Sequence, residues 1–202
     1  MSPSPQSKEA EIVMDPSLGY NASTMSGQNA DKVYLFMKRM LDLLGSFIGL
    51  IILCPLFAVI GLLIKIEAPQ GSVFFRQVRV GQNGKEFHMY KFRSMVANAE
   101  DLLEQLIDQN EVNGNMFKMK NDPRITRIGK FIRKTSLDEL PQLWNVFRGE
   151  MSLVGPRPAL PREVKNYTSY DRQRLQMIPG CTGLWQVSGR NSVGFEEMVE
   201  LD

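Results

Sequence analysis

An apolar segment without a charged side chain, residues 43–64, constrains this 202-residue chain more than any other feature. The segment is 22 residues long, and about 20 apolar residues are enough for an α-helix to cross the ~30 Å hydrocarbon layer of a membrane. The residues that follow it look like those of a soluble domain. We therefore expect a membrane protein with one anchor.

Pro55 stands in the middle of this segment, directly after Cys54. A proline inside a helix removes one backbone hydrogen bond and clashes with the carbonyl four residues earlier, which favours a kink. Basic residues flank the segment on both sides, with Lys38 and Arg39 before it and Lys65 after it. The positive-inside rule expects an imbalance for a crossing helix, so a re-entrant helix with both ends in the cytoplasm fits this pattern. A kinked helix that spans the membrane is the alternative.

The rest of the chain divides into a polar tail and one domain. Residues 1–31 are rich in Ser, Pro, Asn, Gln and Gly, so we predict a disordered tail. Residues 32–68 contain the membrane-associated helix, and residues 69–202 are long enough to form one domain with its own core. The net charge is −3 over residues 1–31 and +5 over the remainder. A basic excess suits a domain that handles phosphates at an anionic membrane surface.

Local patterns predict an α+β domain that is mainly helical with a small β-hairpin. Residues 73–80 and 85–92 are rich in β-branched and aromatic side chains, and the Asn83-Gly84 pair between them is a strong turn signal. Helical spacing of apolar residues predicts the other elements. These are an amphipathic helix within residues 95–110, two short helices within 123–150 that break near Lys134 and Ser136, and a last helix over 161–177.

Few side chains are available for histidine or cysteine chemistry. The only histidine, His88, falls within a predicted strand and beside neither Cys54 nor Cys181, so we interpret it as an ordinary strand residue. A zinc site needs several His or Cys ligands and is excluded. A divalent ion held by carboxylates and phosphate oxygens remains compatible with the composition. Two distant cysteines also give no disulfide framework, which fits a reducing, cytosolic location.

The acidic pair Asp138-Glu139 is the centre of the candidate site. Ser136 and Glu139 have the spacing of a capping box, in which the two residues satisfy the first N–H groups of a helix. On this interpretation the acids only stabilise a helix start. The catalytic alternative rests on a polar face that Asp138 would share with Gln142 and Asn145. The opposite, buried stripe would consist of Leu137, Leu140, Trp144 and Phe147.

Basic side chains surround this pair in the sequence. Arginine forks bind phosphate oxygens bidentately, so we expect an acid in such a cluster to be ionised and available as a nucleophile or metal ligand. Ion pairing with anionic lipid is the other interpretation of each arginine. In Pro156-Arg157-Pro158, two prolines stiffen the backbone and favour presentation of the arginine to a charged ligand. The cluster comprises Arg124, Arg127, Lys130, Arg133, Lys134, Arg148 and Arg157.

These segments together resemble the monotopic phosphoglycosyltransferases, the bacterial sugar transferases that load polyprenyl phosphate with a sugar phosphate. The resemblance covers residues 38–202. It rests on several motifs in one order, namely KRMLDLLGS, the Pro-bearing membrane helix, FFRQVRVG, YKFRSM, NDPRITRIGKFIRKTSLDELPQLWNVFRGEMSLVGPRP and PGCTGLWQVSGRN.

The resemblance implies roles for the site residues. Asp138 would attack the β-phosphorus of a nucleotide diphosphate sugar and expel the nucleoside monophosphate, and polyprenyl phosphate would then attack the phosphosugar-aspartyl intermediate. Glu139 would help to hold Mg²⁺ or assist proton handling, with Asp138 as a second candidate ligand. Basic side chains at motif positions would steady the phosphates. These are Lys91, Arg133 and Arg157, with Arg76, Arg124 and Arg190 as weaker candidates.

The resemblance also implies a location and a pathway. The membrane helix would be re-entrant and broken at Pro55, with the catalytic domain on the cytoplasmic face of a bacterial cell membrane. The reaction would move glucose or galactose 1-phosphate from a UDP-sugar to undecaprenyl phosphate, as the first step of exopolysaccharide or capsule synthesis.

Relatives continue past the position of Asp202, so we expect residues 69–202 to be C-terminally truncated. The alternative is a non-catalytic relative that binds anionic lipid or a partner enzyme. Nucleic-acid binding is not expected.

Overall fold

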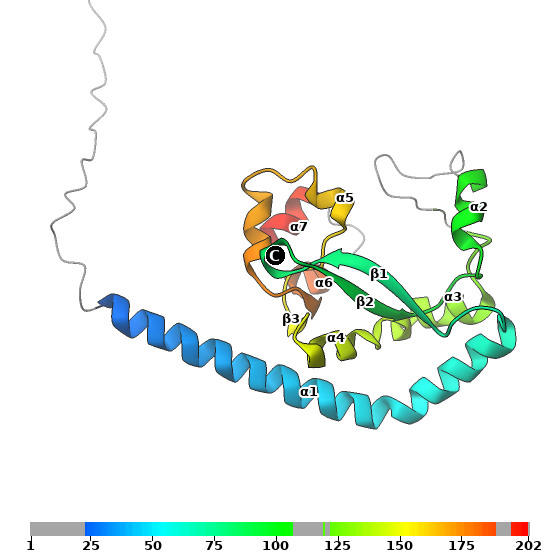
Figure 1. The fold of residues 1–202 in the computed structure, drawn as a ribbon, viewed down its shortest axis with the longest axis horizontal. Helices are drawn as coiled ribbons and strands as arrows, with labels where there is room; N and C mark the ends of the chain where they lie inside the picture. Colours follow the sequence, from blue (N-terminus) through cyan, green and yellow to red (C-terminus); the bar gives the residue numbers. More distant parts are fainter. Residues whose placement is uncertain (1–22, 107–118, 120–121, 189–194, 202) are drawn as a thin grey trace, which may run out of the picture. The chain divides into compact units, whose positions relative to one another are not determined.

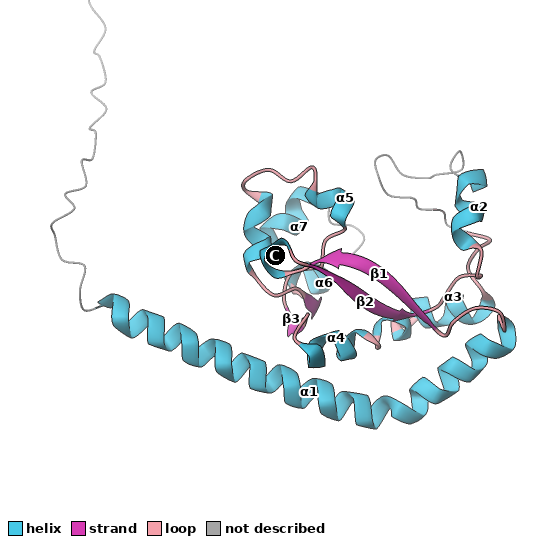
Figure 2. Cartoon of the chain, in the orientation of Figure 1, coloured by secondary structure: helices cyan, strands magenta, loops and turns pink. Residues whose placement is uncertain are grey.

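The computed structural model describes residues 23–106, 119, 122–188 and 195–201. These residues form mainly helices, with two-stranded sheets between them (Figure 2). The chain divides into two compact units, Met1–Met37 and Lys38–Asp202, and each is described by itself. The long helix α1, Ser23–Glu67, begins in the first unit and ends in the second.

The N-terminal unit contains the start of α1. Helix α1 begins at Ser23, so residues 23–31, which we predicted to belong to the tail, are helical. Residues 1–22 of the predicted tail lie outside the described residues. The side chains from Val33 to Met37 are all more than half exposed. Among the described residues, Lys32–Glu67 is the one helix long and apolar enough to cross a membrane, as the apolar segment predicts.

Helix α1 continues through Pro55. Figure 1 shows that its ribbon bends part-way along its length. A bend agrees with the prediction from the sequence, because proline cannot donate the hydrogen bond that closes the preceding turn. The apolar side chains of this part of α1 are largely exposed, and they include Leu44, Phe47, Ile48, Ile51, Ile52, Val59, Leu62 and Ile66.

Polar side chains before the apolar segment attach α1 to the domain. Arg39 donates from Nη1 and Nη2 to two backbone carbonyls, at 2.7 and 2.8 Å, at the C-terminal end of α4 (Gln142–Arg148). Asp42 is buried, accepts from the Leu153 N–H at 2.9 Å and lies 3.6 Å from Lys38 Nζ. Asp42 therefore has the partners that a carboxylate beside a membrane segment needs.

The C-terminal end of α1 is attached to the same domain. The carboxylate of Glu67 accepts hydrogen bonds from the first two backbone N–H groups of α3 (Arg127–Lys134), at 2.7 and 2.9 Å. These N–H groups have no acceptor within their own helix, and the helix dipole favours a negative charge there. Ile60 and Ile64 of α1 also form a buried cluster with Phe92 and Ile132.

The predicted β-hairpin is confirmed. β1 (Phe74–Val80) pairs antiparallel with β2 (Glu86–Phe92), and a short turn of 3₁₀ helix, Gln82–Gly84, joins them. Asn83 and Gly84 adopt positive φ angles of 57° and 77°. Asn and Gly tolerate this left-handed conformation better than other residues, which explains the turn signal in the sequence.

The helices that follow agree only partly with the predictions. α2 (Ala99–Leu106) lies within the predicted amphipathic helix, of which residues 107–110 fall outside the described residues. Helices α3 and α4 are the two short helices predicted within residues 123–150. They are separated at Thr135 and Ser136, where the sequence predicts the break, and by the 3₁₀ turn η3 (Leu137–Glu139).

The prediction of one continuous last helix over residues 161–177 is wrong. This stretch contains α5 (Pro161–Val164) and a separate 3₁₀ helix, η4 (Asp171–Gln176). The N–H and the hydroxyl of Thr168 each donate to Asp171 Oδ2 at 2.8 Å, and this local turn competes with a continuous helix. A parallel pair of short strands was not predicted, and α6 and α7 follow it. The elements are β3 (Ser152–Val154), β4 (Gly180–Thr182), α6 (Leu184–Ser188) and α7 (Phe195–Leu201).

The predicted buried stripe of α4 is also wrong. Trp144 is 45% exposed, whereas Gln142 and Asn145 are buried. The Trp144 ring stacks on Phe147, and Phe147 stacks on Phe47 of α1, with ring centroids 5.7 and 6.1 Å apart. The aromatic side of α4 therefore lies beside the apolar segment of α1. Its polar side faces the hairpin because Asn145 can satisfy backbone groups there.

Candidate functional site

The acidic pair lies in η3, between α3 and α4, on a turn that starts from an unusual backbone conformation. Ser136 has a φ of 57°, which is left-handed, and its side chain makes no capping hydrogen bond. A capping serine has an extended backbone instead, so the predicted capping box is wrong. The Glu139 N–H donates to the Ser136 carbonyl at 3.2 Å, which closes the turn through the backbone.

The carboxylate of Glu139 turns towards the hairpin. Lys91 Nζ of β2 lies 2.7 Å from Glu139 Oε1. The Lys91 side chain is 21% exposed and the Glu139 side chain 45% exposed. This contact joins residues 48 positions apart. The structure therefore brings a residue named from the resemblance, Lys91, against the acidic pair.

Asp138 is partly buried. Burial raises the pKa of its carboxyl group, and the neighbouring charge of Glu139 raises it further, while Lys91 and Arg133 oppose this shift. We expected the basic cluster to keep this acid ionised, but the largest influence on its pKa is burial, which favours the protonated form. The charges of Glu139, Lys91 and Arg133 thus all act on the Asp138 carboxyl group.

Arg133 and Arg124 occupy different surroundings. Arg133 is in the last turn of α3 and is exposed. Arg124 is only 6% exposed, and its guanidinium holds the Asp122 carboxylate through Nε to Oδ1 at 2.9 Å and Nη2 to Oδ2 at 2.6 Å. The hydrogen bonds from Arg124 hold the pKa of Asp122 below its usual range, although burial opposes them. This buried pair contacts α2, since Arg124 Nη1 donates to the Ala99 carbonyl at 3.3 Å, and Arg133 lies close enough to Asp122 to favour its charged form.

Arg157 lies near a second arginine that the sequence did not single out. Arg79 of β1 is 6% exposed. Burial lowers the pKa of Arg79 to about 10, and the charge of Arg157 contributes to the shift, whereas Glu163 and Glu139 oppose it. The sequence of β1 already indicates the neighbour of Arg79. Alternate residues of a strand lie on the same face, so Arg79 lies beside Gln77.

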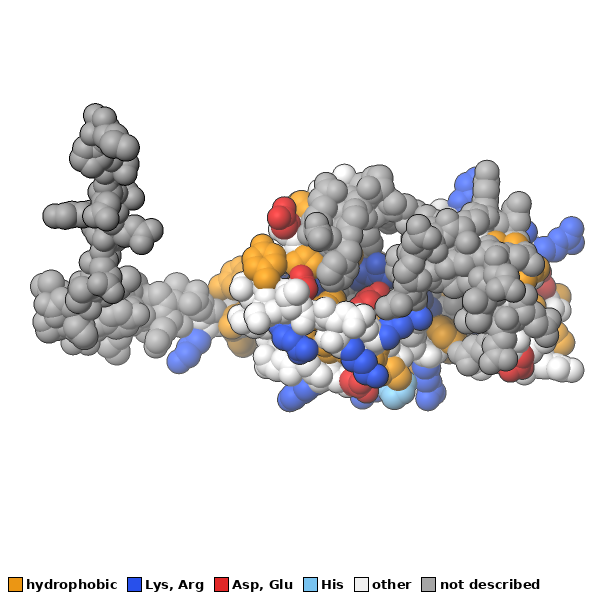
Figure 3. Space-filling model, turned by 90° about the horizontal axis from the view of Figure 1, so that it is seen from above, with side chains coloured by type: hydrophobic (Ala, Val, Ile, Leu, Met, Phe, Trp, Pro, Cys, Tyr) orange, Lys and Arg blue, Asp and Glu red, His pale blue; other side chains and the backbone are white. Residues whose placement is uncertain are grey.

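The remaining predicted residues are dispersed. Arg76 of β1 is exposed, and its guanidinium carbon lies 5.6 Å from the centroid of the Tyr90 ring. Arg190 lies outside the described residues. His88 is exposed on β2, as expected of a strand residue. Figure 3 shows Lys and Arg side chains spread over one face of the domain among acidic ones.

Gln142 and Asn145 do not share an open face with Asp138, as we expected, because both are buried. Asn145 Oδ1 accepts from the Tyr90 N–H at 3.0 Å, and Nδ2 donates to the His88 carbonyl and to Glu150 Oε2, both at 2.7 Å. The role of Asn145 is therefore structural, since its amide joins α4 to β2.

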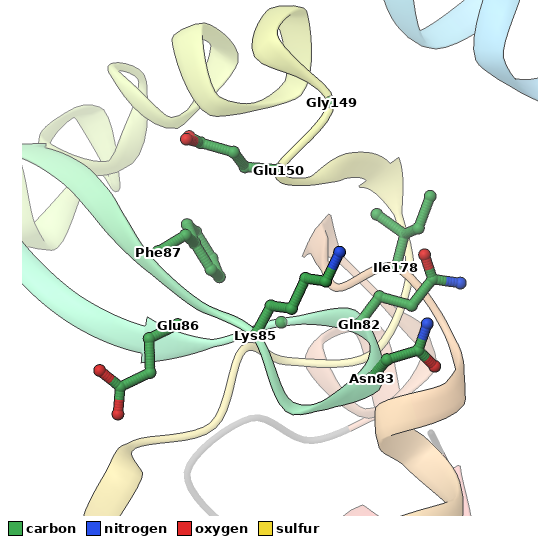
Figure 4. Close-up of a pocket in the computed structure, with 9 residues that line it drawn as sticks. Gln82, Asn83, Lys85, Glu86, Phe87, Gly149, Glu150 and Ile178 are labelled. Atoms are coloured by element: carbon green, nitrogen blue, oxygen red, sulfur yellow. The ribbon is translucent and has the colours of Figure 1, made fainter.

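A cavity at the other end of the hairpin holds none of the predicted site residues. Figure 4 shows it between the hairpin turn and the chain that follows α4, with Lys85, Phe87 and Glu150 around it. Lys91 is five residues from Glu86 along β2, which corresponds to roughly 17 Å in a strand. This cavity is therefore separate from the acidic pair.

Comparison with known proteins places these residues in a family. The family model of bacterial sugar transferases matches residues 33–202. The chain is 49% identical over 185 residues to the galactosyl transferase CpsE of Streptococcus agalactiae, a match that covers 91% of this chain and 41% of the relative. It is 48% identical over 171 residues to the undecaprenyl-phosphate galactose phosphotransferase of Salmonella typhimurium, which covers 83% of this chain and 36% of the relative.

A third relative is shorter. The exopolysaccharide production protein ExoY of Rhizobium meliloti is 44% identical over 172 residues, covering 82% of this chain and 74% of ExoY. The chain thus spans less than half of the length of the first two relatives. Since the family model matches every residue after position 32, the chain belongs to the bacterial sugar transferase family.

Proposed function

We propose that this protein transfers a sugar 1-phosphate from a UDP-sugar to undecaprenyl phosphate and releases UMP. The observation that carries the proposal is the partly buried acidic pair Asp138-Glu139 beside Lys91 and Arg133, in a domain attached to a long apolar helix. The names of the Salmonella and Rhizobium relatives, which refer to undecaprenyl phosphate, galactose and exopolysaccharide, support this substrate class. The sugar is a hexose, glucose or galactose, and the product starts an exopolysaccharide or capsule unit.

The reaction has two displacements at phosphorus. One carboxylate oxygen of Asp138 forms a bond to the β-phosphorus, and the bond between that phosphorus and the bridging oxygen breaks, so UMP leaves with the electron pair. An oxygen of undecaprenyl phosphate then attacks the same phosphorus and frees the carboxylate. Lys91, Arg133 and Arg157 offset the charge of the phosphates during both steps. The partial burial of Asp138 favours its attack, because a partly buried carboxylate has fewer water molecules to lose than an exposed one.

The two carboxylates also fit a Mg²⁺ ion. No group of three or more His, Cys, Asp and Glu side chains is arranged for a metal in the part of the chain that the structure describes. Mg²⁺ does not require such a group, since one or two carboxylates and substrate phosphates commonly suffice. Glu139 and Asp138 would hold the ion, which would neutralise charge on the diphosphate.

The attachment of α1 supports a re-entrant helix. Arg39 before the apolar segment and Glu67 after it are both hydrogen-bonded to the same domain. A helix that crossed a ~30 Å hydrocarbon layer would leave these residues on opposite sides. With the bend near Pro55, the helix enters the bilayer and returns to the cytoplasmic face.

The topology is tested with single cysteines on either side of the apolar segment. In a background with Cys54→Ser and Cys181→Ser, we expect Lys32→Cys and Gln70→Cys both to escape a membrane-impermeant maleimide in intact cells and both to react after permeabilisation. Lys32 and Gln70 are exposed, so burial in the protein does not prevent labelling. Reaction of only one position in intact cells would establish a spanning helix.

The activity is tested by UMP release from UDP-glucose, UDP-galactose and N-acetylated UDP-sugars, with Mg²⁺ and with or without undecaprenyl phosphate. We expect sustained release from one hexose donor only when the lipid phosphate is present, because the carboxylate must be freed for each turnover. Folded protein that releases no UMP from any donor, yet binds anionic vesicles, would support the non-catalytic alternative.

A further inference from the structure

We propose that Arg79 is a positioning residue, which fixes the loop of Arg157 so that this guanidinium meets the diphosphate of the donor. The inference rests on the proposed function, because it assigns a part within the same site. It comes from the way in which the Pro156-Arg157-Pro158 loop is attached to the rest of the domain.

Four consecutive carbonyl groups of this loop accept hydrogen bonds from elsewhere in the domain. The pairs are Pro156 O with Gly180 N–H at 2.8 Å, Arg157 O with Arg174 Nη2 at 3.3 Å, Pro158 O with Arg79 Nη1 at 2.9 Å, and Ala159 O with Val80 N–H at 2.8 Å. Both prolines lack an N–H and have a restricted φ. Acceptor bonds from outside therefore determine how the loop is oriented.

Arg79 is the side chain that links this loop to the hairpin. Its Nε and Nη2 donate to Gln77 Oε1 at 3.1 and 2.7 Å, which leaves Nη1 directed at the Pro158 carbonyl. A guanidinium is a planar fork, so the contact with Gln77 also fixes the direction of the third nitrogen. A lysine ammonium is a single point charge and cannot make both contacts with the same geometry.

The electrostatics agree with a role beside a phosphate site. Arg79 is buried although it is a cation, and the nearby charge of Arg157 adds to the cost of keeping it charged. Two close cations are stabilised when an anion binds next to them. A donor diphosphate at Arg157 supplies such an anion, and Glu139, which acts on Arg79 as well, connects this arginine with the acidic pair.

The test is a double-mutant cycle on the complete protein in nanodiscs. Arg79→Lys is combined with Arg157→Ala, and kcat and KM for the UDP-sugar are measured beside the thermal midpoint of each variant. We expect Arg79→Lys alone to raise KM and to lower kcat/KM about tenfold, since a misplaced side chain weakens transition-state contacts. In the Arg157→Ala background, Arg79→Lys should alter kcat/KM less than about twofold, because the side chain that Arg79 positions is then absent.

A matched control is Arg172→Lys. Arg172 is exposed, and its Nη2 donates to the Val164 carbonyl at 3.5 Å rather than to a carbonyl of the Arg157 loop. Its kinetics should equal those of the unaltered protein. Where Arg79→Lys lowers the yield of folded protein, Gln77→Ala removes the orienting acceptor and keeps the arginine, and the same rise of KM is expected.

The outcomes separate this inference from the proposed function. A purely structural role for Arg79 would reduce the active fraction, which lowers apparent kcat and leaves KM unchanged, and it would add to the effect of Arg157→Ala. Either result overturns the positioning role while the unaltered protein still turns over. If the unaltered protein releases no UMP from any donor, both the function and the inference fail.

Discussion

Replacement of Asp138 by asparagine is expected to reduce UMP release by at least about 10³-fold while the protein stays folded. The loss is large because the carboxylate forms a covalent bond in the proposed reaction and an amide cannot replace it. Glu139→Gln keeps the nucleophile and loses the charged contact with Lys91 Nζ at 2.7 Å. We expect it to cost about tenfold, as for one charge-assisted contact. Both variants are compared in the UMP assay with the same donor and lipid phosphate.

Stability distinguishes a catalytic Asp138 from a structural one. Burial raises the pKa of this carboxyl group, so its charge destabilises the folded protein at neutral pH. An asparagine side chain at this position is uncharged, hence the thermal midpoint of Asp138→Asn should equal or exceed that of the unaltered protein. A marked decrease of the midpoint, or activity within tenfold of the unaltered protein, would contradict the assignment of Asp138 as nucleophile.

The same pKa shift predicts the acidic limb of the rate profile. A raised pKa means that Asp138 takes up its proton at a higher pH than an exposed aspartate does. UMP release should therefore fall, as the pH decreases, before the usual value of about 3.9 is reached, and it should recover as the pH rises. The residual rate of Asp138→Asn should not fall in this pH range, because asparagine has no carboxyl group. This comparison shows that Asp138 is the group whose protonation lowers the rate.

Local patterns were sufficient for the parts of the fold that depend on local rules. The Asn83-Gly84 turn determines the hairpin, since both residues adopt the left-handed conformation that the turn requires. The break between α3 and α4 also falls where the sequence suggests it. The contact of Lys91 with Glu139 joins residues far apart in the chain, and only the resemblance to a family named Lys91 in advance.

The sequence was misleading where tertiary contacts outweigh a local pattern. Ser136 and Glu139 have the spacing of a capping box. The Glu139 carboxylate contacts Lys91 instead, and the backbone at Ser136 is left-handed. Trp144 was expected in the core, yet α4 packs its aromatic side near the apolar segment of α1. A helical wheel gives an apolar face, but it does not tell whether protein or another apolar surface covers that face.

Asn145→Ala is expected to lower the free energy of unfolding by about 3 kcal/mol, at about 1 kcal/mol for each of three hydrogen bonds. Its side chain is 0% exposed and contacts the Tyr90 N–H, the His88 carbonyl and Glu150. Alanine leaves these buried groups without the amide that satisfies them. In a domain of this size the thermal midpoint should fall by about 6–12 °C, measured in the same detergent for each variant.

Two further variants show whether the amide itself is responsible. Asn166→Ala changes an exposed asparagine and should shift the midpoint by no more than about 2 °C. Asn145→Asp keeps the acceptor for Tyr90 but replaces the donors, and it places a second carboxylate near Glu150 Oε2, which lies 2.7 Å from Nδ2. We expect it to destabilise at least as much as alanine at neutral pH, because the buried carboxylate then lies against the partly buried carboxylate of Glu150 and the two repel each other. An Asn145→Ala midpoint equal to that of Asn166→Ala would show that α4 and β2 are held together by their apolar contacts instead.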